Sequence, residues 1–250
     1  MGEWDRRAEE EKMGSGYSTD MEEREEGITI MGHDEGGIRK SSTEVDDGFP
    51  HNYEAILRDA DDFVDRSSKQ KLIEQLYAGV FLNQKKKKYW VDRRWRKNCF
   101  ILFARDLSIT WGDDNRYWHW PLHQESSEMS VPVAELLNVC WLEIHGRFDV
   151  SKLSPETTYE VIFVVMLKDP AYGWHIPVNL RLILPDGSRQ ERKENLMEKA
   201  RGKWIEIQAG EFDTWSMAKN GEIEFSIYEY EGSVWKRGLV IKNVVIRAKA

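Results

Sequence analysis

A chain of 250 residues is long enough for one large all-β domain or two small domains. Residues 1–48 carry fifteen Asp and Glu against six Lys and Arg, about −9, so of the total of −8 the other 202 residues contribute about +1. A body this close to neutral has no overall field that would hold nucleic acid. Two cysteines and the lack of any Asn-x-Ser/Thr sequon argue against a secreted disulfide framework.

The N-terminal residues and the hydropathy of the chain predict an intracellular protein. The first residues, MGEWDRRAEEEK, lack the apolar core of a signal peptide, and the chain has no run of about 18 apolar residues. We therefore expect a soluble intracellular protein with no membrane partner.

Three segments precede the strands. Residues 1–48 are too polar to offset the entropy of ordering and are predicted to be a disordered acidic tail. The text from Ser67 to Val80 has apolar residues at helical spacing, behind a serine cap and with Gly79 near its end, which predicts one short helix packed on the following domain. A partner-binding helix is the alternative. Lys85–Lys88 then form a basic run typical of a solvated loop.

Beyond residue 88 apolar and polar residues alternate, with a period of two residues. The segments are short, rich in β-branched and aromatic residues, and separated by turn signals such as Pro185-Asp186-Gly187. They are 99–104, 107–111, 139–146, 159–167, 178–184, 203–208, 222–230 and 239–248. Strands with hardly a helix between them predict an all-β, jelly-roll-like β-sandwich. The predicted organisation is an acidic tail (1–48), a helical lead-in (49–87) and a β-sandwich domain (88–250).

The motifs that carry catalysis do not occur. The chain has no Gly-x-Ser-x-Gly, no Gly-rich phosphate loop, no His-Glu-x-x-His and no Cys-x-x-Cys. His119 and His123 are four residues apart, but no third ligand is near them in the sequence. We expect a protein that is not an enzyme and that binds no metal and no cofactor.

The unusual feature of the chain is its eleven tryptophans. Trp90, Trp141 and Trp204 lie inside alternating strands, where packing in the core is expected. Trp111 and Trp118 instead bracket the polar loop Gly112–Arg116, so both rings are expected at a loop mouth open to solvent. A sugar ring has an apolar C–H face and a rim of hydroxyls, which an indole with carboxylates beside it satisfies.

Several long stretches resemble one known family. The sequences ARDLSITWGDDNRYWHW, VCWLEIHGRFD, DPAYGW, GEIEFSIYEYEGSVWKRGL and VIKNVVIRAKA are similar to the plant phloem lectins, phloem protein two, which include the tobacco-agglutinin type. The resemblance covers about residues 49–250. It implies a jelly-roll-like β-sandwich, often a homodimer, that binds N-acetylglucosamine oligomers and the cores of N-linked glycans on glycoproteins. It also implies the cytoplasm of phloem sieve elements or companion cells, or the nucleus.

The resemblance also implies a set of sugar-binding residues. The family's two tryptophans match Trp111 and Trp118, and its two glutamates match Glu222 and Glu229. Seven residues of strand span roughly 23 Å, so both glutamates cannot readily serve one short oligosaccharide. Glu229 is the preferred one, because it ends the apolar row of Ile223, Phe225 and Ile227 near a turn.

Some features depart from the lectins and leave alternatives open. The loop 169–177 carries an extra, exposed-looking Trp174, and residues 189–201 lack the lysine-rich segment read as a nuclear signal in the inducible lectins, which leaves nuclear entry open. An RNA-binding or structural phloem protein could use the basic residues between Lys85 and Lys97. A filament linked through Cys99 and Cys140 is a further alternative, although strand-like apolar text around both favours buried thiols.

Overall fold

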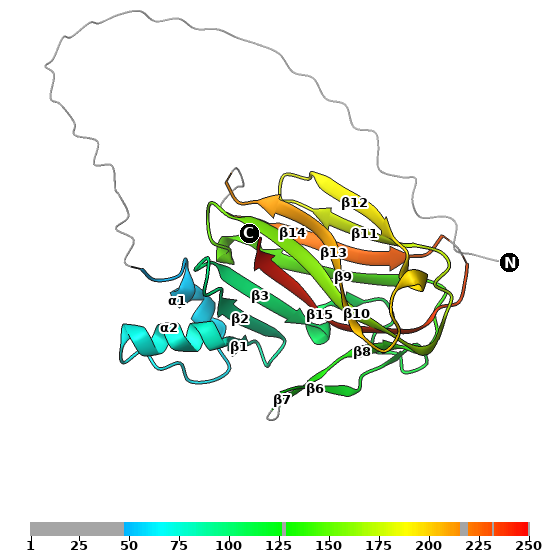
Figure 1. The fold of residues 1–250 in the computed structure, drawn as a ribbon, viewed down its shortest axis with the longest axis horizontal. Coiled ribbons are helices and arrows are strands. Elements are labelled where there is room, and N and C mark those ends of the chain that lie inside the picture. Colours follow the sequence, from blue (N-terminus) through cyan, green and yellow to red (C-terminus); the bar gives the residue numbers. More distant parts are fainter. Residues whose placement is uncertain (1–47, 127–128, 216–219, 232, 250) are drawn as a thin grey trace, which may run out of the picture. The chain divides into compact units, whose positions relative to one another are not determined.

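A computed structural model of the chain describes residues 48–126, 129–215, 220–231 and 233–249 (Figure 1). Except for its last residue, Gly48, the predicted acidic tail (1–48) lies outside these residues. Within them the protein is mostly β-strand, the α-helices lie in the first part of the described chain, and short 3₁₀ turns occur at Ala104–Asp106, Val150–Lys152 and Leu196–Glu198.

The predicted helix is present as α2 (Lys69–Ala78). The Ser68 hydroxyl accepts a hydrogen bond from the Lys71 amide, and Gly79 ends the helix at a φ of 94°, a conformation that suits glycine. Leu72 and Leu76 are buried in the same apolar core as the strands, which confirms that the helix packs on the domain. A short helix α1 (Tyr53–Ile56) and a 3₁₀ turn (Leu57–Asp59) precede it, and neither was predicted.

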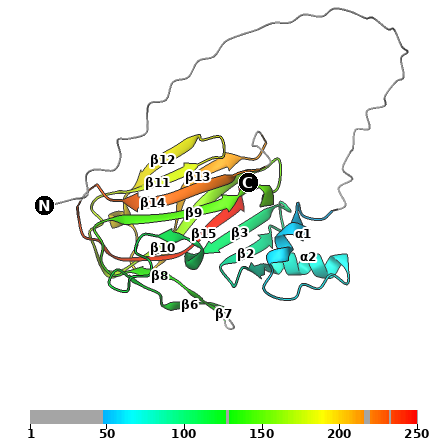
Figure 2. The same cartoon turned by 180° about the vertical axis from the view of Figure 1, so that it is seen from behind.

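The strands form two antiparallel sheets, seen from both sides in Figures 1 and 2. Sheet A has the order β1 (Val80–Leu82), β2 (Lys87–Val91), β3 (Asn98–Phe103), β15 (Arg237–Ala248), β10 (Thr158–Tyr172), β13 (Trp204–Asp213), with β8 (Ala134–Leu136) on β15 and β5 (Trp118–His119) on β8. Sheet B has the order β12 (Arg189–Glu194), β11 (Val178–Ile183), β14 (Glu222–Glu229), β9 (Leu142–Asp149), β4 (Ser108–Ile109). β6 (Leu122–Ser126) and β7 (Met129–Pro132) form a separate hairpin.

The core lies between the two sheets. Alternate residues of β10 and β14 point inward, and the rings of Phe163 and Phe225 meet edge to face with centroids 6.0 Å apart. Gly146 on β9 faces the same layer, and a Cβ atom at this position would overlap the Phe225 ring. These contacts confirm the predicted all-β sandwich.

Each apolar segment predicted as a strand contains a strand of one sheet or the other. Several strands were not predicted. Lys87 and Lys88, expected in a solvated loop, lie in β2. The short strands β1, β5, β6, β7 and β8 were not predicted either, and neither was β12. Its sequence, RQERKE, has no apolar alternation and is almost fully exposed, as an edge strand beside only one neighbour can be. The domain boundary at residue 88 stays a prediction, although β1, which precedes that boundary, pairs with β2 in sheet A.

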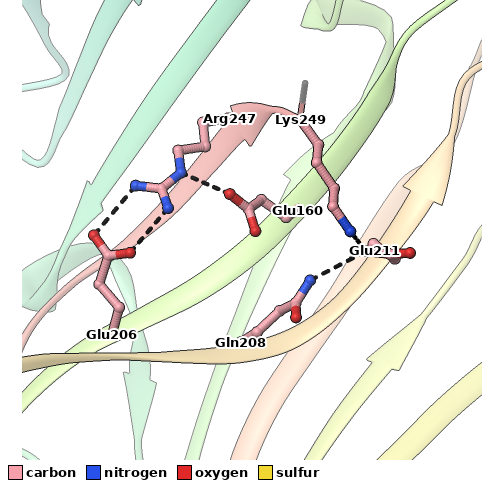
Figure 3. A network of polar contacts seen from close by, with 6 residues as sticks. All are labelled: Glu160, Glu206, Gln208, Glu211, Arg247 and Lys249. Atoms are coloured by element: carbon pink, nitrogen blue, oxygen red, sulfur yellow. Dashed lines mark hydrogen bonds and ion pairs between the residues drawn. The ribbon is translucent and has the colours of Figure 1, made fainter.

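The outer face of sheet A carries a network of charged side chains (Figure 3). Arg247 on β15 binds Glu160 on β10 at 2.7 Å and Glu206 on β13 at 2.9 Å. Lys249 pairs with Glu211 on β13. Each pair is partly exposed and stabilises the fold little by itself, but together they join three neighbouring strands in one register.

Candidate functional site

Trp111 lies at the tip of a tight reversal that follows β4. The Thr110 amide donates to the Glu143 carbonyl (3.0 Å), and the Gly112 amide then turns back to the Ile109 carbonyl (2.8 Å). Trp111 itself has a φ of 58°, in the left-handed region that large side chains rarely adopt. The reversal leaves the indole 45% exposed, with one side tilted against the Tyr117 ring at 5.3 Å between centroids. The prediction of a solvent-accessible ring is therefore confirmed for Trp111.

Two other tryptophans hold this reversal in place. The Trp118 indole Nε1 donates to the Thr110 carbonyl (3.1 Å), and the Trp120 Nε1 donates to the Gly112 carbonyl (2.8 Å). These two carbonyls stand on either side of Trp111. Trp118 is only 2% exposed, so the expectation of an accessible ring at this position was wrong. Because Trp118 pairs with Leu136 of β8, its side chain turns into the core instead of the loop mouth.

The Trp111 ring borders a shallow depression of about 600 Å³. Its lining residues come from the end of β4 and the loop that follows it, and are Ile109, Trp111, Gly112, Asp113, Asp114 and Asn115. Arg116 binds Asp114 through its Nε (3.0 Å) and Nη2 (2.6 Å), and this hydrogen bonding lowers the pKa of the Asp114 carboxyl. Asp113 is fully exposed, with Arg105 3.7 Å away. The depression therefore combines an aromatic ring with ionised hydrogen-bond acceptors.

A carboxylate that sequence reasoning did not select lies beside this loop on the outer face of sheet B. Glu143 of β9 accepts a hydrogen bond from the Thr110 hydroxyl (3.1 Å) and contacts His145 Nε2 at 2.9 Å. The hydrogen bond from His145 is the main cause that lowers the pKa of Glu143. Alternation in LEIHGRFD could have assigned Glu143 to the solvent face. Only the pairing of β4 with β9 brings it next to Trp111.

Trp141 was expected in the core, and this was wrong. β9 begins at Leu142, and the Trp141 side chain is 47% exposed. Leu142 and Ile144 point inward, so Trp141 has the same parity as Glu143 and lies on the outer face. Its ring contacts Tyr230, with the centroids 5.1 Å apart.

Glu229 is buried rather than presented to solvent. Its side chain forms an ion pair with Lys236, and both are almost completely buried. Glu229 Oε1 also accepts from the Glu231 amide (3.0 Å), while Lys236 Nζ donates to the Cys140 carbonyl (2.9 Å). Glu229 ends the apolar row of β14, as expected. Because the side chains of this row face the core, the Glu229 side chain faces the core as well.

Glu222 lies at the opposite end of β14. It is exposed and pairs with Asp149, whereas Glu229 pairs with Leu142. Glu143, beside the Trp111 loop, is six residues from Asp149 along β9, which corresponds to roughly 20 Å. The structure therefore joins Trp118 to the Trp111 loop through its hydrogen bond to the Thr110 carbonyl but keeps Glu222 apart from both.

The family model described as phloem protein 2 matches residues 97–248. The chain belongs to the phloem protein 2 family. One member, PHLOEM PROTEIN 2-LIKE A1 of Arabidopsis thaliana, is 54% identical over 203 residues, which are 80% of this chain and 81% of that protein. A protein named lectin from Luffa acutangula is 48% identical over 200 residues, 80% of this chain and 94% of that one.

Among solved structures, a carbohydrate-binding module, TmCBM61 in complex with β-1,4-galactotriose, has 12% identity and a TM-score of 0.35. The match covers 57% of this chain and 87% of the module. At this level the likeness adds nothing to the assignment of the fold.

Other features of this phloem protein 2 domain were also singled out from the sequence. Trp174, expected to be exposed, is buried, and its Nε1 donates to the Arg237 carbonyl (2.9 Å). Cys99 is buried, as expected, whereas Cys140 is only partly buried, and both are free thiols. Within the described ranges, no three His, Cys, Asp or Glu side chains gather as metal ligands, and no helix is long and apolar enough to cross a membrane.

The basic cluster around β2 is partly engaged in the protein's own contacts. Lys87 pairs with Asp106 at 3.4 Å, and Arg96 donates to the Gly48 carbonyl at 2.6 Å. The Arg93 guanidinium lies 4.7 Å from the centre of the Tyr77 ring. RNA binding through this cluster stays a prediction.

Proposed function

We propose that this phloem protein 2 family member binds carbohydrate, and does so without catalysis, at the depression beside Trp111. The observation that carries the proposal is the half-exposed indole next to ionised acceptors, because a sugar presents an apolar face and a rim of hydroxyl donors. The lectin name of the Luffa relative, of which the chain covers 94%, supports the same class of ligand.

Each residue of the site has a separate role in this proposal. Trp111 stacks on one sugar ring, and Asp114, oriented by Arg116, accepts hydrogen bonds from its hydroxyls. Trp118 acts as a positioning residue through its hydrogen bond to Thr110. Pre-orientation of this kind strengthens binding because less freedom is lost when the ligand arrives.

The two family glutamates have different parts. Glu229, which is buried, is a positioning residue, whereas Glu222 stands outside the proposed site because it lies at the far end of β14. This division of roles departs from the set that the family resemblance implies.

The proposed ligands are N-acetylglucosamine oligomers and the cores of N-linked glycans, as the family resemblance implies. A single sugar should bind weakly, because one stacked ring and a few wet hydrogen bonds barely exceed the entropic cost of association. We also propose that the protein forms a homodimer and is found in phloem.

Calorimetry with chitotriose tests the proposal. Trp111→Ala should weaken binding by about 1–3 kcal/mol, roughly 5- to 150-fold. Trp95→Ala is the matched control, because Trp95 is 42% exposed like Trp111 but lies on the turn that joins β2 and β3 of sheet A. It should leave the affinity unchanged. Equal losses in both variants would contradict the site, and heat with galactosides but none with chitotriose would contradict the specificity.

A further inference from the structure

A row of aromatic side chains extends the surface beside Trp111. We define the Trp141 platform as Trp141, Tyr230 and Tyr228. The Trp141 and Tyr230 rings have centroids 5.1 Å apart, and the Tyr230 and Tyr228 rings 5.2 Å apart and tilted by 22°. Arg181 closes the row, with its guanidinium 4.7 Å from the centre of the Tyr228 ring and its Nη2 2.6 Å from the Tyr228 hydroxyl.

We propose that the Trp141 platform is a second ring-binding subsite for the oligosaccharide that Trp111 binds. The inference rests on the proposed function. Trp141 is 47% exposed, nearly the same as Trp111, and Tyr230 is also exposed. Tyr228 is only 7% exposed and supports the Tyr230 ring from below, so the surface open to water is that of Trp141 and Tyr230. Neighbouring aromatic rings held open to water mark a candidate binding surface.

Glu143 connects the two subsites. The hydroxyl of Thr110, the neighbour of Trp111, donates to the Glu143 carboxylate, and Trp141 stands two residues before Glu143 on the same outer face. The carboxylate therefore lies between two exposed indoles, on strands that are about 4.8 Å apart. Consecutive sugar rings of one oligosaccharide would stack on the two indoles. Hydroxyls beside the linkage between these rings would donate hydrogen bonds to the Glu143 carboxylate.

The platform is held rigidly from beneath by the buried pair of Glu229 and Lys236. Lys236 Nζ donates to the carbonyl of Cys140, the residue before Trp141. Glu229 Oε1 accepts from the amide of Glu231, the residue after Tyr230. One ion pair thus fixes the backbone beside both rings, so little ordering is needed when a ligand binds.

The two subsites should separate by ligand length. In calorimetric titrations with chito-oligosaccharides of two to five sugars, wild-type affinity should rise with length. Trp141→Ala should leave the disaccharide affinity within about 2-fold of wild type and lower that for the longer oligomers by about 5-fold or more. Trp111→Ala should weaken binding at every length, and the control Trp95→Ala should weaken it at none.

The outcomes distinguish the subsite from the site at Trp111. Wild-type affinities at all lengths in Trp141→Ala would overturn the subsite alone, whereas a wild-type protein that binds no chito-oligosaccharide would overturn both. If Trp141→Ala changed the sedimentation of the protein and not its sugar affinity, the platform would be an interface between copies, and the subsite would also be overturned. Trp141→Phe, which keeps a ring, should recover most of the length dependence, and thermal melts should show that all variants fold.

Discussion

Replacing Trp118 separates a positioning role from direct contact with sugar. The indole is buried in the core and donates one hydrogen bond to the Thr110 carbonyl. Truncation to alanine should therefore reduce the free energy of unfolding by about 3–5 kcal/mol, the usual loss for a large buried ring. For a domain of this size that corresponds to a fall in Tm of roughly 6–20 °C. Sugar binding should fall too, because the carbonyl that precedes Trp111 loses its anchor.

Trp118→Phe isolates the contribution of the hydrogen bond. The ring keeps most of its buried area but loses the N–H, so the Thr110 carbonyl remains without that donor at a cost of about 1–3 kcal/mol. We expect a smaller fall in Tm than for alanine, together with weaker chitotriose binding.

Thermal melts paired with chitotriose titrations on Trp118→Ala, Trp118→Phe and Trp111→Ala provide the measurement. Trp111→Ala should lose affinity with little change in Tm, because its ring is half exposed. If Trp118→Ala kept the wild-type Tm while losing all affinity, the ring would act on sugar directly, and the reasoning from its burial would be refuted.

Three further changes test other parts of the molecule by the same melts and titrations. Gly146→Ala should destabilise the fold by about 1–3 kcal/mol because its Cβ would overlap the Phe225 ring, and an unchanged Tm would contradict that packing. Glu229→Gln should lower the free energy of unfolding by about 3–5 kcal/mol, because the Lys236 ammonium stays buried without its carboxylate. An unchanged Tm would mean that water reaches the pair. Removal of residues 1–47 should leave both Tm and sugar affinity unchanged, because their composition cannot supply a core. A clear drop in Tm would mean that part of this N-terminal segment belongs to the folded domain.

The fold was predictable because its strands alternate clearly. β10, β11 and β14 each place a row of buried apolar residues on one face, and β15 is an apolar run buried on both faces over most of its length. These patterns are properties of the chain alone. β12 lacks that pattern because an exposed edge strand buries almost nothing. Its existence depends on its pairing with β11, which no local pattern of its own sequence reveals.

The candidate site was predictable only in part, and parity explains several of the differences. Trp141 is next to the inward-facing Leu142, so strand alternation assigns Trp141 to the surface. Glu229 is two residues from the inward-facing Ile227, so the same alternation assigns Glu229 to the interior. Trp118 is different. Its burial follows from pairing with Leu136, eighteen residues away, and two residues of strand are too short to show an alternating pattern.

The buried pair of Glu229 and Lys236 is hard to explain by stability alone. Removing two charges from water costs about as much as their attraction returns, and two apolar side chains of the same size would fill the space at least as well. Apolar side chains, however, could not make the hydrogen bonds to the Cys140 carbonyl and the Glu231 amide. These bonds fix the backbone beside the two rings of the Trp141 platform at once, so the pair determines where the aromatic surface stands. A carboxylate that the family resemblance assigns to sugar contact can in this way govern sugar binding without touching the ligand.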